Sequence, residues 1–383
     1  MTVTAPRGFR AAGVAAGLKS SGNSDVALVV NDGPRRDAAG VFTGNRIKAA
    51  PVRWCEEIIG RGSLAAVILN SGGANACTGA AGFADTRSTA TQLAGLLDVT
   101  ADDIAVCSTG LIGERLPMDK LSSGIDDAYG ALAVDGGQAA AEAIMTTDSR
   151  PKTAVVQGPG FTVGGMAKGA GMLAPGLATM LVVLTTDAVA GSADLDAALR
   201  AATRVSFDRI DSDGAMSTND TVLLLASGAS DQTPSLEVLT AVVTRACREL
   251  AEQLIADAEG ATKEIAIEVL HAASEDDAVA VGRAVARNSL VKTAFFGEDP
   301  NWGRILAAVG TTAAAFDPDQ IDVAINGVWI CQAGAVGADR GLVDLKPRSV
   351  HVQIDLHAGI ETATILTNDL SHAYVHENSA YST

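Results

Sequence analysis

Short apolar runs alternate with helical patterns along the whole chain. Four runs are almost continuously apolar, at 63–70, 104–107, 180–184 and 222–225. Runs of this length without polar alternation are typical of strands that are covered on both faces. The first two end in small polar loops, Ser71-Gly72-Gly73 and Ser108-Thr109-Gly110. The pattern therefore predicts buried strands with polar loops at their carboxyl ends.

Two helices can be predicted from their apolar stripes. The longer one is expected to begin with Thr233 as its cap and Pro234 in its first turn, and to stop at Gly260. Its stripe consists of Leu236, Leu239, Val243, Leu250 and Leu254. A shorter helix is expected over about 193–205.

The last third of the chain follows a different pattern. Apolar and polar residues alternate over 264–269 and 350–356, which is typical of half-exposed strands. Asn326-Gly327 separates the apolar runs 321–325 and 328–331, a strong signal for a tight hairpin. We expect antiparallel pairing here. The whole chain predicts an α/β fold of layered mixed sheets packed against helices.

Composition excludes several classes of protein. The chain has 383 residues, 48% of them apolar, so it can bury a large core and is not intrinsically disordered. A formal net charge of −17 and the absence of a basic cluster argue against binding to nucleic acid or to an anionic membrane surface. No apolar run approaches the roughly 20 residues that span a bilayer.

Cysteine usage and the first residues favour the cytoplasm. Five cysteines without a C-x-x-C pair predict neither a disulfide framework nor a zinc site, and we expect them to be buried or inert. The stretch 1–22 lacks the basic and apolar regions of a signal peptide. His372 and His376 have helical spacing, but no third ligand accompanies them. We therefore expect them to be structural and predict no metal site.

The glycine-rich segment 164–176 holds the most informative chemistry. It lacks the Gly-Lys-Ser/Thr of a phosphate loop and the G-x-G-x-x-G of a dinucleotide site. One interpretation is a flexible turn before the strand at 180–184. The other is that Thr179 is a nucleophile at a chain break. Its hydroxyl would attack the Ala178 carbonyl, and the released α-amine would then serve as its base.

Several motifs together resemble one family. The segment KGAGMLAPGLATML at 168–181 is similar to the self-processing site of the ornithine acetyltransferases, the glutamate N-acetyltransferases of arginine biosynthesis. Further similar segments are NSGGANACT at 70–78, CSTGLIG at 107–113, IMTTD at 144–148, STNDT at 217–221, DAEGATK at 257–263, VKTAFFG at 291–297, DPNWGR at 299–304 and DLSHAYVHENSAYST at 369–383. They cover nearly the whole chain in order, which makes the resemblance specific.

The resemblance implies a self-processing fold of the N-terminal-nucleophile type. A precursor would be cut between Ala178 and Thr179 into an α chain, 1–178, and a β chain, 179–383. Both pieces would share one core, so the cut is not a domain boundary. Two α and two β chains would then assemble.

The resemblance also implies roles for single residues. Thr179 would be the nucleophile, and Thr109 and Gly110 would stabilise the oxyanion. A hydroxyl and an adjacent glycine N–H are suitable donors for that purpose. Substrate would be bound by Thr146, Lys168, Thr179, Glu259, Asn378 and the terminal Thr383.

Two of these residues can also be interpreted from the residues alone. Lys168 stands in a stretch that is otherwise uncharged, where it could pair with a substrate carboxylate, although most lysines are simply solvated. Glu259 follows a long predicted helix, where a carboxylate opposes the helix dipole. It is either a surface acid paired with Lys263 or an anion held for a substrate ammonium group.

The activity implied is ping-pong transfer of an acetyl group from N2-acetyl-L-ornithine to L-glutamate through acetyl-Thr179. No cofactor is required, and the sequence leaves open whether acetyl-CoA also donates. Two further alternatives are an N-terminal-nucleophile aminopeptidase and an uncleaved amino-acid-binding protein. The binding protein would remain one chain and would transfer no acetyl group, and loss of the Thr179 hydroxyl would not change its activity.

Overall fold

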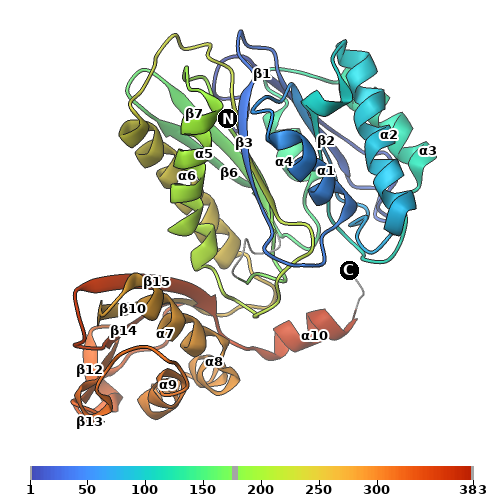
Figure 1. Cartoon of the computed structure of the whole chain (residues 1–383). Coiled ribbons are helices and arrows are strands. Elements are labelled where there is room, and N and C mark those ends of the chain that lie inside the picture. Colours follow the sequence, from blue (N-terminus) through green and yellow to red (C-terminus); the bar gives the residue numbers. More distant parts are fainter. Residues whose placement is uncertain (1, 175–179, 381–383) are drawn as a thin grey trace.

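The computed structural model describes residues 2–174 and 180–380. Within these residues the strands form three sheets, with four, five and six strands. The first two sheets and their helices make up the upper block in Figure 1. The third sheet lies below them with its own helices, and the last helix reaches back toward the upper block (Figure 1).

The four-stranded sheet has the order β1-β2-β4-β5. Its strands are β1 (Phe9–Val14), β2 (Val26–Asn31), β4 (Ala66–Asn70) and β5 (Ile104–Ser108). Strands β4 and β5 pair in parallel, and both are buried along their whole length. Their carboxyl ends therefore meet at one edge, where the two predicted polar loops begin.

The five-stranded sheet has the order β3-β9-β8-β7-β6. Its strands are β3 (Asp37–Phe42), β6 (Lys152–Gln157), β7 (Thr162–Lys168), β8 (Leu181–Thr186) and β9 (Thr221–Ala226). Strand β7 pairs antiparallel with β8, and β8 pairs in parallel with β9. One sheet thus combines strands from both sides of the bond between residues 178 and 179.

Strands β8 and β9 are buried because each of their faces packs on a different core. Leu181 and Val183 face the core shared with the four-stranded sheet. Val182 and Leu184 face the core beneath the next two helices. Successive side chains point to opposite faces of a strand, so apolar residues are needed at every position. The prediction of strands covered on both faces is confirmed.

Helices cover the layers on both sides. They are α1 (Ala50–Ile59), α2 (Gly79–Leu97), α3 (Met118–Gly130), α4 (Gly137–Ala143), α5 (Ser192–Arg204) and α6 (Leu236–Ala256). Helices α5 and α6 pack on the outer face of the five-stranded sheet, and α2 and α3 lie at the opposite side of the block (Figure 1). No helix within 2–174 and 180–380 is both long and apolar enough to cross a bilayer.

The predicted start of the long helix was wrong by a few residues. Ser235, not Thr233, is the N-cap of α6, because its side chain accepts a hydrogen bond from the Val238 N–H. The helix ends at Ala256, before Gly260. Gly260 has φ +60, and a Cβ there would lie 2.2 Å from the Tyr374 nitrogen. This glycine is needed for the close approach of the C-terminal helix rather than to stop α6.

The six-stranded sheet has the order β13-β12-β11-β14-β10-β15. Its strands are β10 (Glu264–Ala272), β11 (Asp322–Ile325), β12 (Val328–Gln332), β13 (Ala335–Val336), β14 (Ser349–Asp355) and β15 (Glu361–Asn368). Helices α7 (Glu275–Arg287), α8 (Ser289–Phe296) and α9 (Trp302–Val309) accompany it, and α10 (His372–Ala380) follows.

The hairpin predicted at Asn326-Gly327 joins β11 and β12, and both turn residues have positive φ. The expectation of antiparallel pairing was wrong for one pair, because β10 and β14 run parallel. Alternation reports which side chains are buried but not the direction of the neighbouring strand. The prediction of layered mixed sheets with helices is confirmed.

Four of the five cysteines are buried, as expected, but Cys77 is exposed. All five are free thiols. His372 and His376 are exposed on α10, and His372 packs edge-on against Phe296 with ring centroids 5.4 Å apart. This contact fits the structural role predicted for His372.

A buried ion cluster ties strand β6 to its neighbours. Lys152 is completely buried, and its Nζ lies 2.5 Å from Asp148 Oδ1 and 2.6 Å from Asp257 Oδ2. Burial alone would raise the pKa of Asp148, but Lys168, Lys152 and the Gly169 N–H lower it to about 2. The cluster is stable only while each charge keeps its partners.

Replacing Lys152 should therefore destabilise the fold, and the loss in the free energy of unfolding should be larger at neutral pH than near pH 2. The folded-state pKa of Asp148 lies below its ordinary value, so its contribution is complete above about pH 4 and is lost as the pH falls toward 2. Lys152→Met should cost about 3–5 kcal/mol at neutral pH and shift acid unfolding to higher pH. Urea unfolding across the pH range measures both effects.

Lys48→Met is the matched control, because the ion pair of Lys48 with Glu56 is only partly buried. We expect it to cost less than about 1 kcal/mol. If Lys152→Met and Lys48→Met lost the same free energy of unfolding, the importance assigned to the buried cluster would be contradicted.

Candidate active site

Six predicted site residues line one pocket. They are Thr109, Gly110, Thr146, Lys168, Glu259 and Asn378. The pocket is bordered by the loop after β5, the end of β7, the turn after α6 and helix α10. The predicted residues Ala178, Thr179 and Thr383 lie outside the described residues.

Thr109 and Gly110 are positioned by the parallel pair β4–β5. The Thr109 N–H donates to the Asn70 carbonyl (2.9 Å), and the Gly73 N–H donates to the Thr109 carbonyl (3.0 Å). Gly110 has φ +129, and a Cβ there would lie 2.8 Å from the Gly73 nitrogen. Only glycine fits between these two loops. The hydroxyl and the glycine backbone are therefore held at the pocket wall.

Lys168 reaches the same wall from strand β7. Its side chain is almost fully buried, and Nζ donates to Thr109 Oγ1 over 3.2 Å. Because this oxygen accepts from the lysine, the Thr109 hydroxyl proton remains available to a third group. Burial lowers the pKa of Lys168, whereas the carboxylates of Asp148, Asp220 and Glu259 oppose this shift. The pocket thus holds a cation next to a hydroxyl donor.

Glu259 supplies the opposite charge. The Thr147 hydroxyl donates to its Oε1 (2.7 Å), and Asn378 Nδ2 donates to its Oε2 (3.0 Å). A Cβ on Gly171 would lie 2.7 Å from Oε2, so this residue of the glycine-rich segment must stay small. The carboxylate is half-buried in the turn after α6. The residues alone left two interpretations of Glu259, and these contacts favour the pocket anion over a surface acid paired with Lys263.

Thr146 lines the pocket and is held there by Asp148. Its N–H donates to Asp148 Oδ2 (2.9 Å), and its hydroxyl lies 3.5 Å from the same oxygen. The Gly169 N–H donates to Asp148 Oδ1 (2.7 Å). Asp148 therefore joins the Thr146 loop to the residue that follows Lys168.

Sequence reasoning missed several residues that support the site. Asn219 donates to the carbonyls of Ala74 (2.6 Å) and Ser108 (2.8 Å), which fixes the loop before β9 against the end of β5. Thr147 holds Glu259. These residues lie inside motifs that carried the family resemblance, but no spacing rule assigned them a partner.

Asp220 was also missed. It is completely buried, and its Oδ1 accepts a hydrogen bond from the Met180 N–H (3.1 Å), the amide that follows Thr179 in the chain. Burial raises its pKa well above the usual range, although the Met180 N–H opposes this. Asp220 therefore anchors the first described residue after the glycine-rich segment.

The pocket contains opposite charges but no cluster suited to a metal ion. Among the described residues, one group of three His, Cys, Asp or Glu donors is close enough to hold an ion, and it lies in the C-terminal sheet. The pocket can instead bind a small zwitterion, with its carboxylate near Lys168 and an ammonium group near Glu259.

Comparison with known proteins agrees with the resemblance in the sequence. The ArgJ family profile matches residues 10–383. The chain is 64% identical over 382 residues to the arginine biosynthesis bifunctional protein ArgJ of Streptomyces avermitilis, covering all of both chains. The corresponding protein of Thermobifida fusca is 64% identical over 383 residues, again covering all of both chains.

One solved structure is the ornithine acetyltransferase of Mycobacterium tuberculosis in complex with ornithine. It is 54% identical, with a TM-score of 0.43, and the match covers 47% of this chain and 96% of that chain. The family profile and the two curated relatives each extend over essentially the entire sequence. The chain belongs to the ArgJ family.

Proposed function

We propose that this chain transfers an acetyl group from N2-acetyl-L-ornithine to L-glutamate in arginine biosynthesis. The observation that carries the proposal is one pocket that combines Lys168, Glu259 and the Thr109-Gly110 pair. These groups suit the two charged ends of an amino acid and the oxyanion of acyl transfer. Family membership supports the same activity.

The nucleophile in this proposal is Thr179, freed by cleavage after Ala178. Met180, the next residue, is anchored to Asp220, which interacts electrostatically with Lys168. This contact supports a nucleophile near the pocket. The free α-amine of Thr179, with an ordinary pKa of about 7.7–8.0, would accept the hydroxyl proton. Cleavage would give an α chain, 1–178, and a β chain, 179–383.

The reaction then proceeds in two halves. Thr179 Oγ attacks the acetyl carbonyl, and the oxyanion is stabilised by the Thr109 hydroxyl and the Gly110 N–H. Ornithine leaves after taking the proton back from the α-amine, and acetyl-Thr179 remains. Glutamate enters the same pocket, and its amine takes the acetyl group. The chain's own residues supply every group that these steps need.

The curated relatives are named bifunctional, which supports a second acetyl donor, and we propose acetyl-CoA for that role. We also propose that the enzyme works in the cytoplasm as two α and two β chains. The free thiols of all five cysteines are consistent with a reducing compartment.

Loss of the Thr179 hydroxyl should abolish both processing and transfer. Intact mass of the denatured wild-type protein should show two fragments split between Ala178 and Thr179. Thr179→Ala should give one uncut chain without acetyl transfer, whereas Thr179→Ser should retain cleavage and some activity. An uncut wild-type chain that still transfers acetyl would exclude the α-amine as base. An uncut wild-type chain without acetyl transfer, whose amino-acid binding is unchanged in Thr179→Ala, would favour the binding-protein alternative.

Removing the Thr109 hydroxyl should slow the chemical step. Thr109→Val keeps the shape of the side chain but removes one oxyanion donor, so kcat should fall by roughly 10²–10³. Thr109→Ser keeps the hydroxyl, so its kcat should fall much less. Steady-state kinetics with N-acetylornithine and glutamate measure the difference. Equal kcat values for the two variants would exclude Thr109 from oxyanion stabilisation.

Neutralising Glu259 should weaken substrate binding more than the chemical step. Glu259→Gln removes the charge opposite the substrate ammonium group, and KM for N-acetylornithine should rise roughly tenfold to a hundredfold. Glu252→Gln, on the exposed face of α6, is the matched control and should leave KM unchanged. An unaltered KM in Glu259→Gln would rule out the ammonium contact.

A further inference from the structure

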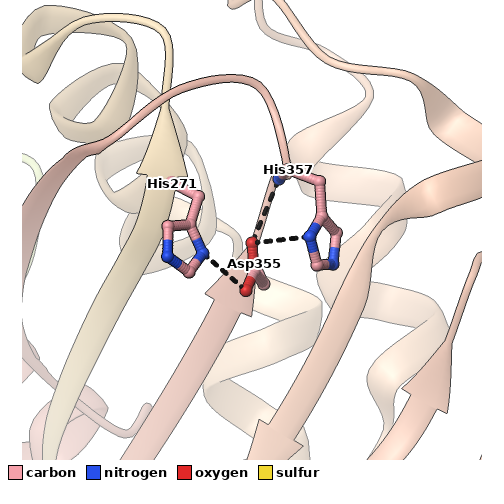
Figure 2. Close-up of side chains that lie close together, drawn as sticks. All are labelled: His271, Asp355 and His357. Carbon is pink, nitrogen blue, oxygen red and sulfur yellow. Dashed lines mark hydrogen bonds and ion pairs between the residues drawn. The ribbon is translucent and has the colours of Figure 1, made fainter.

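Two histidines and an aspartate meet at one end of the C-terminal sheet, apart from the pocket. Figure 2 shows the imidazoles of His271 and His357 on either side of the Asp355 carboxylate. One donor atom from each residue lies within 4.8 Å of the other two. His271 belongs to β10, Asp355 ends β14, and His357 follows two residues later. The first contact is a hydrogen bond, with His271 Nδ1 2.8 Å from Asp355 Oδ2.

The contact between His357 Nδ1 and Asp355 Oδ1 cannot be a hydrogen bond if the imidazole of His357 is neutral. His357 Nε2 lies 2.8 Å from Asp322 Oδ2, so this nitrogen carries the proton that Asp322 accepts. In a neutral ring the other nitrogen, Nδ1, then has a lone pair. That lone pair faces Asp355 Oδ1 at 3.5 Å. Two acceptors face one another here, which is the arrangement that a cation between them would stabilise.

The 3.5 Å distance between His357 Nδ1 and Asp355 Oδ1 matches the distance between two ligand atoms on one metal ion. It is longer than the usual 2.7–3.2 Å hydrogen bond. Two ligand atoms on one tetrahedral zinc ion, each about 2.0–2.1 Å from the metal, are separated by roughly 3.4 Å. His271 Nδ1 would become the third ligand by losing its proton to solvent. Both histidine side chains are about half exposed, so an ion and its remaining water ligands can enter.

The backbone holds the ligands in place. The His271 carbonyl accepts hydrogen bonds from the N–H groups of Ala358 and Gly359, both at 2.8 Å. His271 and His357 themselves have φ of +50 and +49, a left-handed region that most side chains avoid. The loop after β14 is therefore tied directly to β10, and the three ligands are positioned by regular strands and short connections.

We propose that His271, Asp355 and His357 bind a divalent transition-metal ion of the zinc type. Asp322 acts as the outer carboxylate that fixes the tautomer of His357, an arrangement common around zinc-bound histidines. Two imidazoles favour zinc, nickel or copper over the hard ions magnesium and calcium, which prefer oxygen ligands. The two carboxylates supply the negative charge that the ion balances.

The site serves the stability of the C-terminal sheet and not acyl transfer. Its ligands come from β10, β14 and the loop that follows, and Asp322 begins β11, so an ion would link three neighbouring strands. Glu259 precedes β10, whereas His271 lies near its other end. The strand from Glu264 to His271 spans roughly 23 Å. Metal binding should therefore raise the unfolding temperature without changing acetyl transfer.

Calorimetric titration of the chelator-treated full protein with Zn²⁺ tests the proposal. We expect one ion per chain, and no heat with Mg²⁺. His271→Asn and His357→Asn should each weaken Zn²⁺ binding by at least roughly tenfold, and Asp322→Asn should weaken it by roughly tenfold to a hundredfold. Asparagine is used because it tolerates positive φ. Circular dichroism verifies that each variant is folded.

Two variants serve as controls. His351→Asn removes a histidine of the same sheet that contacts one carboxylate, Glu268. Cys77→Ser removes the exposed thiol. Both should bind Zn²⁺ like the wild type and show the same rise in unfolding temperature. Absence of stoichiometric binding, or unchanged binding in the double variant of His271 and His357, would overturn the proposal.

Discussion

The carboxylate of Asp148 is the contact on which the pocket depends. It accepts hydrogen bonds from Lys152, from the Thr146 N–H and from the Gly169 N–H. These groups belong to three separate segments: the loop before β6, strand β6 itself and the residue after β7. Two buried lysines, Lys152 and Lys168, are stabilised by the same negative charge. A neutral residue at this position would leave both cations poorly compensated.

This arrangement explains how a buried lysine can line the pocket. Lys168 can remain beside Thr109 because the negative charge of Asp148 compensates its positive charge. Glu259, held by Thr147 and Asn378, lines the same pocket. One charge of each sign suits the two ends of an amino acid, and the Thr109 hydroxyl beside Lys168 suits an acyl group. Helix α10 contributes Asn378 and so links the C-terminal unit to the pocket.

Much of the fold follows from apolar patterning. The runs around β4, β5, β8 and β9 require apolar residues at every position because both faces of each strand are buried. The start of α6 could not be placed, since Thr233 and Ser235 are both acceptable caps and only the hydrogen bond to Val238 distinguishes them. The parallel pairing of β10 with β14 depends on tertiary contacts that alternation does not encode.

The site was predictable only where the motifs of the family carry it. Thr109, Gly110, Lys168 and Glu259 come from three of those motifs and line one pocket. Asp220 and Asn219 could not be assigned from the sequence, because their roles are contacts with backbone groups far along the chain. The histidine pair of the C-terminal sheet was missed for the same reason: His271 and His357 come together only through the pairing of β10 and β14.

The central claim is that the acetyl group passes through Thr179. The most direct measurement is the intact mass of the acid-quenched β chain after incubation with N-acetylornithine but without glutamate. The account predicts a chain that is heavier by one acetyl group at Thr179 and that loses this group when glutamate is added. Steady acetyl transfer with no acetylated β chain at any quench time would contradict it.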